Sequence, residues 1–135
     1  KVSQVDGQIN VTANSQEYLG LNIDVGNPHA VVFVEDLAAI GDLKSAPMVK
    51  PETTYPDGVN IEFVRFLEDG QIGMRVFERG VGETDACGSG ALCLFNYAYS
   101  EKKVLNPTTI LFPGGELDLE YKNEELFLSG TVTYL

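Results

Sequence analysis

The stretch that most constrains the fold is CGSGALCLFNYAYSE, residues 87–101, which predicts a helix that is apolar on nearly all sides. A helix without a broad polar face must be enclosed by other parts of the chain. Most of the remaining sequence consists of short strand-like runs separated by turn signals. We therefore expect an α+β domain in which a mostly antiparallel, curled β-sheet wraps around a central helix.

The strands are predicted from alternating apolar and polar residues that follow glycine-containing turns. In QIGMRVF, for example, Ile72, Met74 and Val76 fall on one face of the strand. Such alternation is typical of an antiparallel sheet with one buried face. A second, weaker helix is expected over residues 36–46, where apolar residues recur at helical spacing. The strand candidates are residues 3–12, 17–24, 30–35, 59–67, 71–78, 108–112, 115–121 and 125–134.

Length and charge limit the domain count and the classes of partner. The 135 residues suffice for one domain, residues 1–135, with its own core. Nine basic and twenty acidic residues give a net charge of −11, which disfavours nucleic acid and anionic membranes because both require a basic surface. No apolar run is long enough to span a bilayer. Residue 1 is Lys instead of Met, so we expect a piece of a longer chain. The sequence is also compatible with a homodimer.

The cysteines and the single histidine argue against a disulfide and against zinc. On one helix, Cys87 and Cys93 would lie about 9 Å apart along the axis, beyond the Cα separation of about 7 Å that a disulfide tolerates. Two free thiols suit the cytoplasm. One histidine, His29, and no closely spaced cysteine pair predict no metal site. Cys93 lies among leucines and phenylalanine, so we interpret it as a core residue.

Cys87 is the candidate functional cysteine, although a free cysteine is most often a small core residue. It follows a glycine-rich stretch and begins the predicted helix, with Gly88 and Gly90 close by. The first backbone N–H groups of a helix have no internal partner and form an anion site. Such a site stabilises a thiolate, and it also stabilises a substrate carboxylate beside it.

Other polar residues carry weaker signals when each is considered alone. Asn27 and His29 lie in GNPH between two predicted strands, where a turn and a functional role are equally supported. Asn60 begins a strand after a Pro-Asp-Gly turn. Glu78 and Arg79 could form a surface ion pair. The glycines that follow them lack the Gly-Lys-Ser/Thr of a phosphate loop, so we reject nucleotide binding.

The order of four motifs changes this assessment. They resemble motifs of the carboxyl-terminal domain of the diaminopimelate epimerase family, whose members are cofactor-independent amino-acid epimerases. The resemblance covers about residues 22–135, and FPGGELDL at 112–119 also looks like the family's strand after its central helix. The four motifs are GNPH at 26–29, PDGVN at 56–60, ERGVGET at 78–84 and ACGSG at 86–90.

The resemblance implies a catalytic role for Cys87 as one of the family's two acid/base cysteines. Glu78 matches the carboxylate that adjusts the ionisation of that thiol and also contacts substrate. Gly88 and Ser89 match the helix-start positions whose N–H groups hold the reacting carboxylate of the substrate. The family often has Thr where this chain has Ser89, a mild change.

The resemblance also implies that Asn27, Asn60 and Arg79 grip the substrate, largely at the end that does not react. His29 matches the group that tunes the second cysteine. That cysteine belongs to the family's amino-terminal domain, which has a similar fold and faces the carboxyl-terminal domain across the cleft that forms the active site. This chain contains no such second domain, so we expect it to be the carboxyl-terminal half of a two-domain enzyme.

The implied reaction interconverts LL- and meso-diaminopimelate without a cofactor. One cysteine removes the α-proton from one face while the other delivers a proton to the opposite face. Because Cys87 supplies only one face, little or no activity is expected from this chain alone. The setting implied is lysine biosynthesis in the cytoplasm, and the partner implied is a small amino-acid substrate.

Three other functions are alternatives to this interpretation of the sequence. A related racemase that acts on another amino acid, such as proline or histidine, would use the same kind of site. A cysteine hydrolase would pair Cys87 with His29, but no sequence signature supports it. A non-catalytic domain could keep the fold, although the joint presence of Cys87, Glu78 and Arg79 argues against it.

Overall fold

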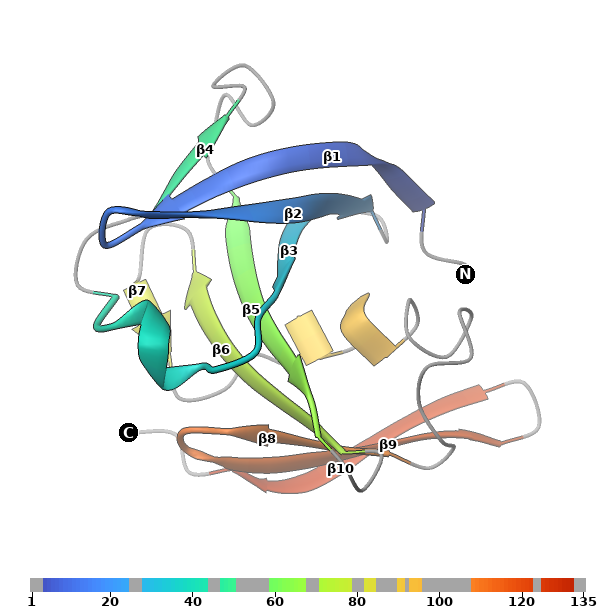
Figure 1. Ribbon diagram of the computed structural model, residues 1–135. Coiled ribbons are helices and arrows are strands. Elements are labelled where there is room, and N and C mark those ends of the chain that lie inside the picture. Colours follow the sequence, from blue (N-terminus) through green and yellow to red (C-terminus); the bar gives the residue numbers. More distant parts are fainter. Residues whose placement is uncertain are drawn as a thin grey trace.

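The computed structural model describes residues 4–24, 28–43, 47–50, 59–67, 71–78, 82–84, 90–91, 93–95, 108–122 and 125–132. Within these residues the chain is built mainly of strands (Figure 1). The elements are β1 (Gln4–Ala13), β2 (Gln16–Asp24), β3 (Pro28–Phe33), η1 (Ala38–Ile40), β4 (Met48–Lys50), β5 (Asn60–Phe66), β6 (Ile72–Glu78), β7 (Gly82–Thr84), β8 (Thr108–Phe112), β9 (Gly115–Lys122) and β10 (Glu125–Val132).

The strands form one mixed, open sheet in the order β10-β9-β8-β6-β5-β3-β2-β1-β4, and β7 pairs with β6 beside this path. Seven of the strand pairings are antiparallel, whereas β3 with β5 and β6 with β8 are parallel. The prediction of a mostly antiparallel sheet is therefore confirmed. All the strands predicted from alternation are present with small shifts at their ends. The three-residue strands β4 and β7 were not predicted.

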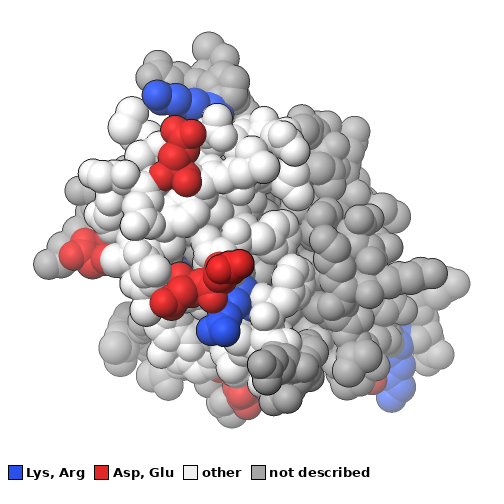
Figure 2. Space-filling model, in the orientation of Figure 1, with Lys and Arg blue, Asp and Glu red and all other residues white. Residues whose placement is uncertain are grey.

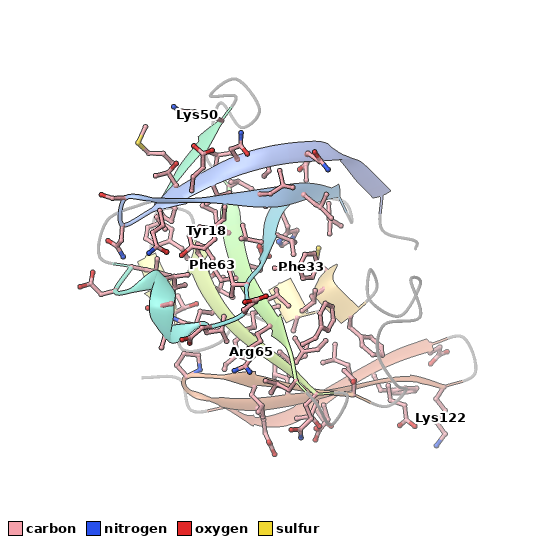
Figure 3. All side chains as sticks on the ribbon, in the orientation of Figure 1. Tyr18, Phe33, Lys50, Phe63, Arg65 and Lys122 are labelled. Atoms are coloured by element: carbon pink, nitrogen blue, oxygen red, sulfur yellow. The ribbon has the colours of Figure 1, made fainter. Side chains whose placement is uncertain are left out.

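The sheet curves so that the β1–β2 hairpin and strands β8–β10 lie on opposite sides of short helical pieces (Figure 1). Those helical residues belong to one apolar cluster with side chains from β2, β3, β5, β6, β8 and β9. A second cluster covers the other face, where Tyr18 and Phe63 meet edge to face with ring centroids 6.1 Å apart (Figure 3). The middle strands are consequently buried on both sides.

The helix predicted over 87–101 is described only at five residues. Gly90, Ala91, Cys93, Leu94 and Phe95 are helical and buried, and all but Gly90 have no solvent exposure. The predicted core position of Cys93 is confirmed. The other residues of the range lie outside the described part of the chain, so enclosure of an intact helix stays a prediction.

The helix predicted over 36–46 is wrong for the residues that the structure describes. Only one 3-10 turn forms there, η1, and the chain is irregular from Gly41 to Leu43. Gly41 has φ of +79°, a left-handed conformation that ends a helix. Apolar spacing alone did not reveal that the turn stops at this glycine.

The β1–β2 hairpin holds this irregular segment in place. Asn14 and Ser15 form its turn with φ of 48° and 67°, the paired positive values of a tight two-residue hairpin turn. The amide Nδ2 of Asn14 donates to the backbone oxygens of Ile40 at 2.7 Å and Asp42 at 2.6 Å. A side chain thus satisfies carbonyls that a continuing helix would have bonded internally.

Candidate active site

Three of the predicted site residues lie in one row across the sheet. His29 pairs with Asn60 in the parallel register of β3 and β5. Ile61 pairs with Phe77 in the antiparallel register of β5 and β6, so Asn60 stands opposite Glu78 one step further along. Paired residues project to the same face of a sheet. His29, Asn60 and Glu78, each taken from a different motif, therefore share one face at one end of the sheet.

This face is the one that packs against the helical residues. Two positions along the three strands, Val31, Glu62 and Val76 form the next row of the same face. Val31 and Val76 belong to the apolar cluster that contains the helix. His29 is completely buried, whereas Asn60 and Glu78 are partly exposed. The first row therefore begins in the core at His29 and reaches solvent at Asn60 and Glu78, on the face of the sheet that packs against the helical residues.

A buried acid–base pair joins the two rows. His29 Nδ1 and Glu62 Oε1 are hydrogen-bonded, and neither side chain has any solvent exposure. Within the described part of the chain, His29 Nε2 and Glu62 Oε2 are buried without a hydrogen-bond partner. An unsatisfied buried polar atom lowers stability by about 1–3 kcal/mol, so two of them together are strongly destabilising in a structural core.

Glu62 is the residue that sequence reasoning missed. In NIEFVRF it alternates with Ile61 and Phe63, which places it on the polar side of a strand with one buried face. In the structure β5 is central, and Ile61 through Val64 are all buried. The available signal was the run Phe63-Val64, whose apolar residues point to both faces and so favour a strand covered on both sides.

The environment raises the pKa of Glu62 above its ordinary value of 4.5. Burial is the largest cause, because it disfavours the charged carboxylate. The hydrogen bond from His29 and its charge act in the opposite direction but do not cancel the effect of burial. The negative charge of Glu78, in the neighbouring row, raises the pKa further.

This raised pKa predicts a pH dependence of stability. Between pH 4.5 and the raised value, the folded state holds a proton on Glu62 that the unfolded state has released. The free energy of unfolding should therefore fall as the pH rises through this window, and the contribution should be fully present below it. Glu62→Gln has no carboxyl to titrate, so urea unfolding of both proteins at several pH values should show the wild type losing stability relative to the variant. Parallel curves for the two proteins would contradict this assignment.

An ion pair on the opposite face anchors β7 to β6. Arg75 Nε and one Nη donate to the two carboxylate oxygens of Glu83 at 2.7 Å and 2.8 Å. The other Nη of Arg75 donates to the backbone oxygen of Leu37 at 2.8 Å. The hydrogen bond to Glu83 is the main cause of a raised pKa for Arg75. This fork holds β7 against β6.

The remaining predicted site residues lie outside the described part of the chain. Their sequence positions adjoin the row and the helix. Asn27 directly precedes Pro28, the first residue of β3, and Arg79 directly follows Glu78. The residues concerned are Asn27, Arg79, Cys87, Gly88 and Ser89.

Among the described residues, few features suit a metal ion, a nucleic acid or a membrane. No group of three or more His, Cys, Asp or Glu side chains among these residues could hold a metal ion. The face in Figure 2 shows acidic side chains with few basic ones, and no broad basic surface appears among its described residues. No described helix is long and apolar enough to cross a membrane.

Two pockets within the described residues lie away from the row. One, of about 340 Å³, lies beside η1 and includes Leu37, Arg65 and Arg75. The other, of about 290 Å³, lies on the outer face of β8–β10 and is lined by Thr109, Asp118, Glu120, Phe127 and Ser129. Neither includes His29, Asn60 or Glu78, and neither contains a residue of the predicted site.

Comparison with known proteins decides the family. The sequence profile of diaminopimelate epimerase matches residues 21–135. The chain belongs to the diaminopimelate epimerase family. The resemblance inferred from the four motifs is thereby confirmed.

Several curated relatives carry the name diaminopimelate epimerase. The protein from Streptomyces coelicolor is 40% identical over 133 residues, covering 92% of this chain and 46% of the relative. The protein from Parabacteroides distasonis is 34% identical, covering 90% and 46%, and that from Methanococcus maripaludis is 32% identical, covering 91% and 45%. The chain thus spans about half the length of these relatives.

A solved structure supports the fold. The crystal structure of a phenazine biosynthesis protein of the PhzF family from Bacillus anthracis matches with a TM-score of 0.50 and 20% identity. The match covers 96% of this chain and 40% of the other. The present chain and the PhzF protein therefore share a fold over most of the present chain.

Proposed function

We propose that residues 1–135 form the carboxyl-terminal domain of a diaminopimelate epimerase and supply one half of its active site. The observation that carries this proposal is the row of His29, Asn60 and Glu78, which brings three separate motifs together on the face that packs against the helix. Family membership and the name diaminopimelate epimerase of the relatives support an epimerase reaction. The reaction we propose is the interconversion of LL- and meso-diaminopimelate.

We assign Cys87 as the acid/base of this half, at the start of the helix that the sequence predicts over 87–101. The N–H groups of Gly88 and Ser89 would hold the reacting carboxylate of the substrate, because a helix start attracts anions. Glu78, at the end of β6, would adjust the ionisation of the thiol. Asn27, Asn60 and Arg79 would bind the distant amino-acid end of diaminopimelate, with Arg79 pairing with its carboxylate.

Inversion of the α-carbon needs two proton-transfer groups on opposite faces. Cys87 as thiolate would remove the α-proton, and the bonding electron pair would stay on carbon as a carbanion. A thiol on the other face would deliver its proton to that carbanion. The helix start next to the substrate carboxylate would stabilise the developing charge, and closure of the site would exclude water. No pyridoxal cofactor is required in this scheme.

The second thiol would come from another domain. Cys93 is buried in the core cluster and six residues from Cys87, so it cannot face the same substrate. The curated relatives have about twice the length of this chain, enough for a second domain of similar size. His29 would act on that second thiol. The proposed setting is lysine biosynthesis in the cytoplasm.

A direct test uses a fusion in which this chain replaces the matching part of the Streptomyces coelicolor relative, called here the joined enzyme. Both the 135-residue chain and the joined enzyme are incubated with LL-diaminopimelate in D2O, and loss of the α-proton NMR signal is followed. We expect exchange and formation of the meso isomer with the joined enzyme, and at most traces with the chain alone. Rapid exchange by the chain alone would contradict the two-domain site. Conversion of proline or histidine instead of diaminopimelate would identify a related racemase.

A further inference from the structure

The His29–Glu62 pair has an arrangement that packing alone does not explain. Both side chains are fully buried between the apolar residues of neighbouring strands, and Glu62 pairs with Val31 on one side and Val76 on the other. One hydrogen bond joins His29 Nδ1 to Glu62 Oε1. Among the described residues, His29 Nε2 has no partner. The ring is therefore hydrogen-bonded at Nδ1, whereas Nε2 is buried without a partner among the described residues.

The hydrogen bond restricts where the pair can exchange protons. With a single proton, the favourable arrangement places it on Nδ1, facing the carboxylate, and leaves a lone pair on Nε2. With two protons, one lies in the bridge between Nδ1 and Oε1 whichever atom holds it, and the second lies on Nε2 or on Oε2 of Glu62. In both states a proton occupies the bridge, so the ring stays hydrogen-bonded at Nδ1.

The charge of the Glu62 carboxylate also affects the pair. The pair carries one negative charge with a single proton and no net charge with two. An isolated buried histidine would instead become a buried cation when it accepts a proton, which burial strongly disfavours. The carboxylate therefore compensates a positive charge on the buried ring.

We propose that Glu62 is a positioning residue that keeps the proton of neutral His29 on Nδ1 and leaves Nε2 unprotonated. This inference rests on the proposed function for its effect on the reaction, whereas the state of the ring does not depend on that function.

The first test reads the His29 ring directly. His29 is the only histidine, so the ring nitrogen signals of the ¹⁵N-labelled chain need no further assignment. At about pH 8, above the ordinary pKa of histidine, we expect a slowly exchanging Nδ1–H signal and an unprotonated Nε2. Glu62→Gln should keep this pattern, because its amide oxygen can still accept from Nδ1–H. Glu62→Leu should lose it. Proton placement on Nε2 in the wild type, or an unchanged pattern in Glu62→Leu, would overturn the proposal.

The second test measures the reaction in the joined enzyme. Glu62→Leu should lower kcat about 10- to 100-fold, the range typical of partners that orient a functional side chain, with little change in KM, whereas Glu62→Gln, which keeps the state of the ring, should retain most of the activity. The matched control is Glu120→Gln, which removes an exposed carboxylate on β9 and should leave kcat unchanged. A loss of kcat of about 10-fold or more in Glu62→Gln would overturn the proposed role even if Glu62→Leu failed to fold. An inactive joined enzyme would count against the proposed function alone, because the ring signals would still decide whether Glu62 positions His29.

Discussion

Replacing Cys87 with alanine in the joined enzyme is expected to lower kcat for diaminopimelate epimerisation by about 10³-fold or more, since a positioned acid or base contributes about 10²–10⁴-fold. In our proposal this thiol alone serves one face of the α-carbon, and no other group replaces it. The KM should change far less, because our proposal assigns substrate binding to Asn60, Arg79 and the helix start. Kinetics of formation of the meso isomer measure both quantities.

Cys93→Ala is the matched control for this prediction. Cys93 is fully buried in the core cluster, so its replacement should reduce stability modestly and leave kcat within about twofold, well below the contribution of an acid/base group. A large loss of kcat in Cys93→Ala, with Cys87→Ala still active, would show that the wrong thiol has been assigned.

Phe95→Ala is expected to lower the free energy of unfolding of the chain by about 3–5 kcal/mol, the usual cost of removing a buried phenylalanine side chain. Phe95 has no solvent exposure and lies in the cluster that joins the helical residues to six strands. Its removal would leave a cavity at the centre of the curved sheet. Urea unfolding followed by circular dichroism measures the change.

Phe127→Ala is the control for that measurement. Phe127 lies on β10 and is 50% exposed, so its loss should cost much less than that of Phe95. Equal destabilisation by the two substitutions would mean that the helical residues do not form the centre of the core. A cost below about 1 kcal/mol for Phe95→Ala would lead to the same conclusion, because core truncations of this size exceed it.

The strands could be predicted from sequence because their period of two was regular and their turns contained glycine or proline. Strand β6, for example, alternates Ile72, Met74 and Val76 on the face that packs against the helix. The three-residue strands β4 and β7 are too short to show a period. The helix expected over 36–46 failed because Gly41 and the hydrogen bonds from Asn14 end it after one turn. That interaction spans more than twenty residues of sequence and leaves no local signal.

The candidate site was predicted in part. His29, Asn60 and Glu78 were proposed from separate motifs, and the sheet register places them in one row. Glu62 could not be found in the same way, because its role depends on strand order. Only the parallel pairing of β3 with β5 brings it beside His29, and only burial on both faces makes its charge significant. Sequence patterns reveal which face a residue occupies more readily than which neighbour it meets.

The measurement that tests the two-face mechanism most directly is the position of deuterium after the first turnovers of the joined enzyme in D2O. Starting from LL-diaminopimelate, the account predicts deuterium at the inverted α-carbon of the meso product, while the recovered LL isomer still carries its proton. That pattern requires one group to remove the proton and a different group to deliver deuterium. Equal deuterium in both isomers from the start would indicate a single acid/base group that serves both faces, and would contradict the assignment of Cys87 to one half of a two-domain site.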